Sequence, residues 1–243
     1  MKGRAEVKRR YESSLRGAQA QSTREAVIAA AGRLFAEQGY AATSIEEIAA
    51  AAGVSRATVF TSVGGKPKLL KTALDVAIVG DDEPVSLPER PRSKAIRAEA
   101  DPRKYLALYA GLVTEMYGRL AAIHEAVRGA AGVDPDARAL WESHLAQHRQ
   151  GAANVISDLV RKGGIRPDLT VEAAADIVWL LGPGAYHMLV HRRGWSPARF
   201  QEWLTETFIG QLLPEEHSRS RRVESGHTPR RVKGRAVRAR GHE

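Results

Sequence analysis

The apolar residues of this chain recur at helical spacing, and no stretch alternates between apolar and polar residues as a half-buried strand would. The segment 22–40 is the first clear case. Ser22 or Thr23 can cap the start of a helix there, and Gly39 stands where a C-terminal glycine is expected. Its apolar side chains fall on one helical face: Val27, Ile28, Ala31, Leu34 and Phe35.

Two short helices and a glycine turn are predicted in residues 43–63. Ser44 and Glu47 form a capping box, and Thr43 with Glu46 offers a second register for the same cap. Gly53 permits the left-handed turn that ends the first helix. Ser55 can then cap the second helix. The inward positions of the pair are Ile45, Ile48, Ala49, Ala52, Val54, Val59 and Val63.

The remaining pattern is helical as well. Pro67 fits the first turn of a helix that follows Gly64 and Gly65. The segment 80–92 contains three prolines and reads as a loop and a domain boundary. Further helices are expected at four places, with Thr170 and Ser196 as caps and a break at Gly182-Pro183-Gly184: residues 103–129, 136–162, 171–193 and 197–213. The fold class is therefore predicted to be all-α.

Two short helices at a tight turn, supported by a third, are typical of a helix-turn-helix unit, which places its second helix in the major groove of DNA. An ordinary corner between two helices of a helical protein is the alternative. Arg56 has the side chain that pairs with guanine O6 and N7, and Ala57 or Thr61 could touch a thymine methyl group. The hydroxyls of Thr43 and Thr58 could bind phosphates.

The stretch "REAVIAAAGRLFAEQGYAATSIEEIAAAAGVSRATVFTSVGGKPKLL", about residues 23–72, resembles the DNA-binding domain of TetR-family transcriptional regulators. The later segment "HRRGWSPARFQEWL" resembles, less specifically, the helical ligand-binding and dimerisation domain of such regulators. The resemblance implies a homodimer, usually a repressor, that leaves a palindromic operator when a small molecule binds. It implies DNA contacts by these residues: Thr43, Ser55, Arg56, Ala57, Thr58 and Lys66.

The sequence departs from the family pattern in the second short helix and just after it. Phe60 replaces the usual tyrosine, and Ser62 and Val63 replace a more usual aromatic pair. Lys68 stands where an acidic residue is usual. The DNA contacts that the resemblance would assign to Phe60 and Ser62 are therefore in question. Thr61 completes the candidate DNA-binding set.

Charge lies at the two ends of the chain. The formal net charge is +9, yet residues 23–213 carry equal numbers of basic and acidic side chains. Residues 1–22 carry six basic and two acidic side chains, and residues 214–243 carry nine and four. Two basic arms suggest a polyanion partner, although solvated arms that aid solubility are the alternative. We expect a flexible arm at 1–22 and a disordered tail at 214–243.

Cysteine is absent, which excludes disulfides, thiol nucleophiles and cysteine-ligated metals. No apolar run approaches the roughly 18 residues of a membrane span, and no signal peptide is recognised at the start, so a cytoplasmic protein is expected. The pairs His144/His148 and His187/His191 lack the glutamate of a zinc protease motif. We interpret them as solvated or pocket-lining histidines, and we expect neither a metal nor another cofactor.

The larger aromatic groups of the C-terminal half suggest an amphipathic ligand pocket, with plain core packing as the alternative. They are Tyr105, Tyr109, Tyr117, Trp141, Trp179, Tyr186 and His187. The predicted domains are a helix-turn-helix domain at 23–79, a linker at 80–102 and a ligand-binding and dimerisation domain at 103–213. A coating or architectural nucleic-acid protein acting through its arms is the alternative function. An all-α enzyme using the histidine pairs is a third hypothesis, which we disfavour.

Overall fold

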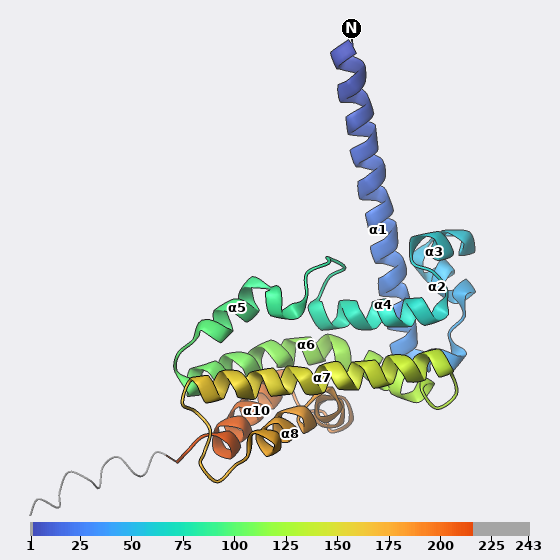
Figure 1. Ribbon diagram of the computed structural model, residues 1–243. Coiled ribbons are helices and arrows are strands. Elements are labelled where there is room, and N and C mark those ends of the chain that lie inside the picture. The colour runs from blue at the N-terminus through green and yellow to red at the C-terminus, as the bar shows by residue number, and fades with distance from the viewer. Residues whose placement is uncertain (1, 216–243) are drawn as a thin grey trace, which may run out of the picture.

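The computed structural model describes the backbone of residues 2–215 and the side chains of residues 16–215. Helices account for most of this part of the chain, and residues 2–215 contain no strand, which confirms the all-α prediction. Figure 1 shows a long first helix that rises from a layered helical body, with two short helices beside its lower half. The predicted tail lies outside the described residues except for residues 214 and 215.

Helix α1 spans Lys2–Ala42, so it begins far earlier than the predicted cap at Ser22 or Thr23. The segment expected to be a flexible arm is helical and continuous with the helix that follows. Residues 2–22 contain no proline and many alanine, arginine, lysine, glutamine and glutamate residues, all strong helix formers. The polar composition that suggested flexibility is equally compatible with a solvated helix. Gly39, with φ 82°, kinks α1 near its end, where a C-terminal glycine was expected.

The short helices form as the capping pattern predicts. Helix α2 spans Ile45–Ala52, begins with the Ser44–Glu47 capping box and ends at Gly53, whose φ is 68°. Helix α3 spans Arg56–Ser62 and has Ser55 as its N-cap, and helix α4 spans Lys66–Val79. Their common core with α1 is fully buried at these side chains: Val27, Ala31, Phe35, Ile48, Val59, Leu69 and Leu70.

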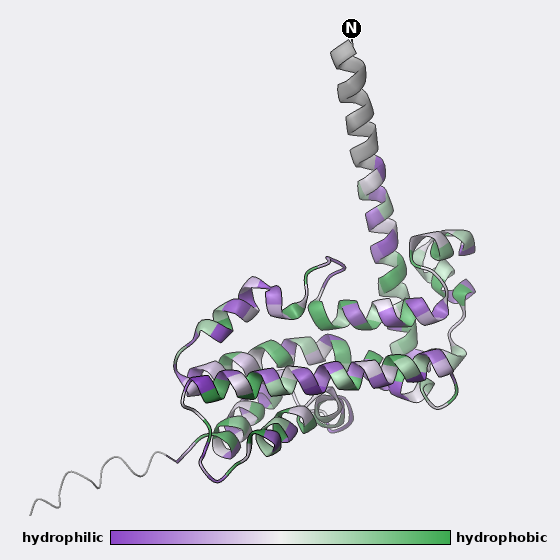
Figure 2. Ribbon diagram, in the orientation of Figure 1, coloured by the Kyte–Doolittle hydropathy of each residue, from purple (hydrophilic) through white to green (hydrophobic). Residues whose placement is uncertain are grey.

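The C-terminal part begins with a short 3-10 turn, η1 (Leu87–Glu89), and helix α5 (Pro91–Ala98). The predicted linker 80–102 therefore contains a helix that the sequence pattern did not reveal. Two long helices follow, α6 (Pro102–Ala130) and α7 (Pro135–Arg161), close to their predicted bounds. Figure 2 shows hydrophobic and hydrophilic residues interspersed along both, as expected for helices with one buried side.

The last helices form a layer beside α7 in Figure 1. Helix α8 spans Val171–Leu180 and α10 spans Pro197–Leu212, capped by Thr170 and Ser196 as predicted. Between them lie α9 (Pro183–Tyr186) and a π-helical segment, η2 (His187–Arg192). The predicted break at Gly182-Pro183-Gly184 is confirmed, because α8 ends just before it.

The stretch Val171–Arg192 is long and apolar enough to cross a membrane when judged by length and composition only. Core helices of soluble proteins pass the same test, so this single stretch is weak evidence for a membrane span. The sequence pattern had suggested none. The stretch is interrupted at Gly182, and Leu180 and Met188 expose 70% and 58% of their surface. It therefore carries apolar surface that the protomer itself does not cover.

Candidate nucleic-acid interface and internal cavity

Helix α3 presents one face to solvent. Val59 is fully buried against the core, whereas Arg56, Ala57 and Thr61 are exposed and Phe60 exposes 46% of its surface. This outward face therefore combines a cation, a methyl group, an aromatic ring and a hydroxyl. Side chains of these kinds can contact base edges in the major groove of DNA.

Several hydroxyls predicted to contact DNA are engaged within α3. The amide of Thr58 donates to Ser55 Oγ at 3.1 Å, and the two hydroxyls lie 2.8 Å apart. Thr61 Oγ1 donates to the carbonyls of Ala57 and Thr58, and Ser62 Oγ donates to the Val59 carbonyl at 3.2 Å. These side chains cap or tighten the helix. The hydroxyls of Thr61 and Ser62 can therefore contact a ligand only as additional acceptors, whereas one of the Ser55 and Thr58 hydroxyls keeps a proton to donate.

Arg56 is held in place by two neighbours. Its Nη1 lies 3.1 Å from Glu46 Oε1 of α2, and its guanidinium carbon lies 5.6 Å from the centroid of the Phe60 ring. Both partners of the ion pair are more than half exposed, so the pair contributes little to stability. Arg56 can therefore exchange Glu46 for another acceptor at small cost.

Thr43 does not occupy the position predicted for a phosphate contact. Its side chain is 1% exposed, and its Oγ1 donates to the Gly39 carbonyl at 2.8 Å. Thr43 thus stabilises the turn between α1 and α2. Lys66 lies at the start of α4 as predicted, with Nζ 4.3 Å from the centroid of the Tyr40 ring. That ammonium group remains partly exposed to solvent.

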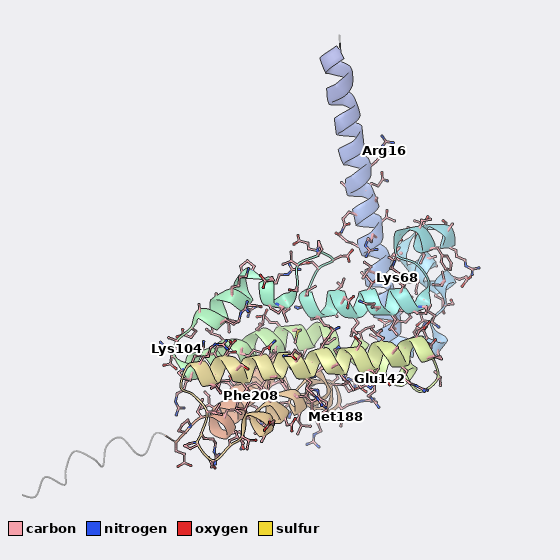
Figure 3. The ribbon with its side chains drawn as sticks, in the orientation of Figure 1. Arg16, Lys68, Lys104, Glu142, Met188 and Phe208 are labelled. Atoms are coloured by element: carbon pink, nitrogen blue, oxygen red, sulfur yellow. The ribbon has the colours of Figure 1, made fainter. Side chains whose placement is uncertain are left out.

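A polar groove of about 590 Å³ separates α1 from α3. On the α1 side it includes Arg16, Gln19 and Arg24, and on the α3 side Thr61 and Ser62. Figure 3 shows Arg16 on the part of α1 that extends past the short helices. Residues 16–24, in the middle of α1, therefore lie beside α3, and the two helices present polar groups to the same space.

Arg24 connects α1, α3 and the loop after α4. Its Nη1 donates to the Ser62 carbonyl at 2.6 Å, and its Nε and Nη2 donate to the two carboxylate oxygens of Asp82 at 2.5 and 3.2 Å. The Asp82 side chain is only 16% exposed. No pattern in the sequence indicated this bridge, because its three residues are far apart along the chain.

A cavity of about 910 Å³ lies between α4, the loop 83–88, α5, α6 and α7. Apolar side chains dominate its lining from α4, the loop and α6: Ile78, Val79, Val85, Leu87, Leu112, Val113, Met116 and Leu120. His144, His148 and Asp158 contribute polar groups from α7. The size lies within the range of small-molecule sites.

Three of the seven predicted pocket residues line this cavity: Tyr105, Tyr109 and Tyr117. The other four are not part of its wall, so the structure does not bring them to this cavity. Trp141 packs against His124 with ring centroids 4.8 Å apart, and Trp179 lies 6.3 Å from His148. Tyr186 is buried against Phe200 at 4.9 Å, and His187 lies 5.5 Å from His191.

The polar groups at the tyrosine end of the cavity are phenols. Tyr105 donates to Asp158 Oδ2 at 3.2 Å. Burial, together with the nearby Asp158 carboxylate, raises the pKa of Tyr105 above its ordinary value. Burial alone raises the pKa of Tyr109, and burial together with the neighbouring Tyr109 raises that of Tyr117. All three therefore remain protonated at neutral pH and can act as hydrogen-bond donors.

A cluster of three histidines lies beside the cavity, with His124 and His144 buried and His148 half-buried. His124 Nδ1 and His144 Nε2 are 3.0 Å apart, and the His144 and His148 rings stack with centroids 6.4 Å apart. Burial lowers the pKa of His124 to about 3 and that of His148 to about 4, and it lowers the pKa of His144 as well. The imidazoles are therefore neutral at pH 7. Among the described side chains, those of residues 16–215, no group of three or more is placed to hold a metal ion.

The sequence pattern also indicated other residues of this cavity wall, which the prediction did not include. Tyr105, Tyr109, Leu112, Met116 and Leu120 recur every three or four residues along α6, which places them on one helical face. Reading that stripe as a pocket wall would have added the aliphatic lining. His144 and His148 were expected to be solvated or to line a pocket, and their placement supports the second reading.

The family model for bacterial regulatory proteins of the tetR family matches residues 27–73, the segment that contains α2, α3 and their support. Residues 27–73 therefore form a DNA-binding domain of the TetR type. TetR-family regulators are soluble, non-enzymatic proteins that bind DNA and small-molecule ligands. The match confirms the resemblance seen in the sequence, and it agrees with the interpretation that the chain is not an enzyme, since regulators of this family are non-enzymatic. It also confirms helix-turn-helix as the identity of the capped pair.

Solved structures share the fold of this chain. NalD of Pseudomonas aeruginosa, the secondary repressor of the MexAB-OprM multidrug efflux pump, is 21% identical, with a TM-score of 0.59, covering 82% of this chain and 99% of its own. FadR of Bacillus subtilis, solved with stearoyl-CoA, is 18% identical, with a TM-score of 0.58, covering 77% and 98%. A candidate regulator of Saccharomonospora viridis, solved with choline, is 20% identical, with a TM-score of 0.57, covering 79% and 98%. No curated protein matches the chain.

Proposed function

We propose that this chain is a dimeric repressor of the TetR family that binds a palindromic operator and releases it when a small molecule occupies the internal cavity. The observation that carries the proposal is the double role of α4. Its start follows α3 directly, and its later residues Asp75, Ile78 and Val79 line the cavity. A change at the cavity wall can therefore reach the helix-turn-helix unit through one rigid element.

The DNA-reading surface is the outward face of α3. Arg56 would donate to guanine, and Ala57 and Thr61 would contact thymine methyl groups or neighbouring bases. Phe60 adds an apolar contact beside Arg56. Lys66 would bind a phosphate at the edge of the site. Ser55, Thr58 and Ser62 would contribute mainly by fixing the ends of α3, since their hydroxyls already bond to it. Thr43 is omitted because it is buried.

The effector would be a largely apolar molecule with hydrogen-bonding groups. The wall is mainly aliphatic and aromatic, and Tyr109 and Tyr117 have no hydrogen-bond partner in the described part of the chain. These phenols and the neutral imidazole of His148 could orient a ligand. The choline and stearoyl-CoA bound by two structural relatives differ too much to indicate one ligand class for this chain.

A dimer would be formed through the layer of α8, η2 and α10. Val171, Leu180 and Met188 expose 48%, 70% and 58% of their surface on this layer. Figure 3 labels Met188 and Phe208 in it. The apolar face of α10 is mostly core of the protomer: Phe200, Leu204, Phe208 and Leu212 are at most 1% exposed. The partner surface is therefore centred on α8 and η2.

The domain division and the location in the cell belong to the same proposal. Residues 23–79 would act as the DNA-binding domain and residues 103–213 as the effector-binding and dimerisation domain. The predicted linker 80–102 contains α5 and cavity-lining residues, so it would act with the second domain. A regulator of this kind would work in the cytoplasm, where bacterial DNA is found.

The test selects bound fragments from random duplex DNA with the purified protein and then compares variants on the selected duplex. Arg56→Ala should weaken binding to that duplex by roughly tenfold to a hundredfold, because a bidentate arginine–guanine contact contributes about 1–3 kcal/mol of discrimination. Arg128→Ala is the matched control, since Arg128 is also an exposed, ion-paired arginine but lies on α6. Equal effects of both substitutions would contradict the proposed reading surface.

A coating or architectural role is the second candidate, favoured by the position of the positive charge. The excess basic residues lie in 1–22 and 214–243. Deleting both segments separates the two functions. A repressor would keep its preference for the selected duplex with a shallower dependence on salt, whereas a coating protein would lose all binding.

A further inference from the structure

Helix α3 depends on contacts at its ends. It spans only seven residues, and a helix of that length is unstable in isolation. Ser55 caps its start through the Thr58 amide. At its other end the Ser62 carbonyl has no partner within the helix and accepts a hydrogen bond from Arg24 Nη1 at 2.6 Å. A cation at this position also interacts favourably with the helix dipole.

Arg24 is itself oriented by Asp82. Both carboxylate oxygens of Asp82 accept hydrogen bonds from the guanidinium, at 2.5 Å from Nε and 3.2 Å from Nη2. The side chains are 30% and 16% exposed, so this pair is better shielded from solvent than the exposed ion pairs of the chain. A bidentate pair of this kind fixes the plane of the guanidinium and therefore the direction of its remaining donors.

The loop that contains Asp82 is joined to the cavity wall by hydrogen bonds. Arg90 donates to both carboxylate oxygens of Asp81, at 2.8 and 2.6 Å, and to the Val85 carbonyl at 3.1 Å. The Glu83 amide donates to Asp81 Oδ1 at 3.0 Å. These bonds tie the segment 81–90 together. Its residues 83–88 form one side of the 910 Å³ cavity.

We propose that Arg24 and Asp82 are positioning residues that couple this cavity wall to the end of α3. A ligand that displaces the loop 83–88 would move Asp82, release or rotate Arg24, and remove the partner of the Ser62 carbonyl. The outward face of α3 would then lose its fixed orientation. This inference rests on the proposed function for its biological use, and it adds a route separate from α4.

The coupling is tested by amide hydrogen exchange of residues 56–64, a measurement that needs neither operator nor effector. Asp82→Ala should speed exchange in this segment by roughly fivefold to tenfold, because a charge-assisted contact at the helix end is lost. Glu115→Ala is the matched control. It breaks the bidentate pair of Glu115 with Arg92, between α5 and α6, at distances of 2.5 and 2.8 Å. It should leave α3 unchanged.

A tryptophan substituted into the cavity wall fills part of the cavity and so imitates a bound ligand. Leu112 lines the cavity and is only partly buried. Leu112→Trp should speed exchange of residues 56–64 in the natural background, with little further effect in the Asp82→Ala background. Such non-additivity is the signature of two coupled sites. If Asp82→Ala unfolds the protein, Arg24→Lys replaces it, since lysine keeps the charge but cannot make the three contacts at once.

The inference is overturned if α3 exchange is unchanged in Asp82→Ala, or if Leu112→Trp acts equally in both backgrounds. Its failure is separate from failure of the proposed function. If exchange is coupled but the protein prefers no DNA sequence, the coupling between cavity and α3 stands and the proposed repressor function fails. If the protein prefers one operator but exchange is not coupled, the repressor function stands, and α4 alone would transmit the signal from the cavity.

Discussion

His124, His144 and His148 form one cluster of three imidazoles, of which the first two are buried and His148 is half-buried, and this arrangement makes the fold sensitive to acid. Burial lowers the pKa values of His124 and His148 to about 3 and about 4, compared with about 6.5 for a histidine in an unfolded chain. Below pH 6.5 the unfolded chain binds protons that the folded chain excludes. The contribution of these neutral histidines to the free energy of unfolding therefore has its full value above pH 6.5, and it falls as the pH decreases toward 4.

We expect each of these two histidines to lower the free energy of unfolding by about 2 kcal/mol between pH 7.5 and pH 5. Urea unfolding at the two pH values measures the change. The variant His148→Gln removes one titrating group, so its loss of stability over the same range should be smaller by about 2 kcal/mol. An equal loss in the variant and the natural protein would contradict a neutral, half-buried His148.

Gly182 shows a different constraint at the level of single residues. A Cβ built there would lie 2.3 Å from the His148 ring and 3.0 Å from the Trp179 carbonyl oxygen. No larger side chain fits without displacing one of them. The glycine therefore serves close packing of the break after α8 against α7, beyond its effect as a helix breaker.

Short helices of this chain are defined by their caps. The hydroxyl of Ser44 accepts from the Glu47 amide at 3.1 Å, and the Ser44 amide donates to Glu47 Oε2 at 2.7 Å. We expect Ser44→Ala to lower the free energy of unfolding by about 1 kcal/mol, the usual effect of losing an N-cap. Ser157→Ala is the control, because that hydroxyl only bonds to the Ala153 carbonyl within α7. Its substitution should change the midpoint of urea unfolding far less; equal shifts would contradict a capping role for Ser44.

The helices that could be predicted from the sequence are those whose ends carry strong local signals. Gly53, Ser55 and Pro67 marked α2, α3 and α4, and Thr170 and Ser196 marked α8 and α10. Helix α5 was missed because only Ser93 and Ile96 of its eight residues are buried, too few to set a period. The helical start of α1 was missed because polar composition suits both a solvated helix and a flexible arm.

At the scale of the whole molecule, prediction from sequence reached the function class but only part of the site. The α6 tyrosines were found because they lie on the same face of one helix. The loop 83–88 and the bridge from Arg24 to Asp82 depend on tertiary contacts between distant segments, which no periodicity reveals. Trp141 and Trp179 were assigned to the pocket because aromatic character does not distinguish a cavity wall from the packing behind it.

The exposed apolar layer predicts the oligomeric state. Leu180 and Met188 lie on α8 and η2 and are more than half exposed, so a partner copy would cover them. Light scattering should give twice the mass of the 26.5 kDa chain for the natural protein. Leu180→Glu should weaken the dimer by at least tenfold, since it would bury an unpaired charge. Val133→Glu is the control, because Val133 is also exposed but lies far along the chain from this layer.

A dimer in which Leu180→Glu has no effect would place the partner surface elsewhere. A natural protein that stays monomeric at micromolar concentration would remove the basis for a palindromic operator, because the two-fold symmetry of such DNA matches two copies of the chain.

The most direct test of the account is selection of bound fragments from random duplex DNA, followed by affinity for the selected duplex at two salt concentrations. The account predicts an inverted repeat whose half-sites are a whole number of helical turns apart, bound far more tightly than scrambled duplex at both salt concentrations. Binding to every sequence alike, with a steep loss at higher salt, would contradict it and would assign the interaction to the basic segments.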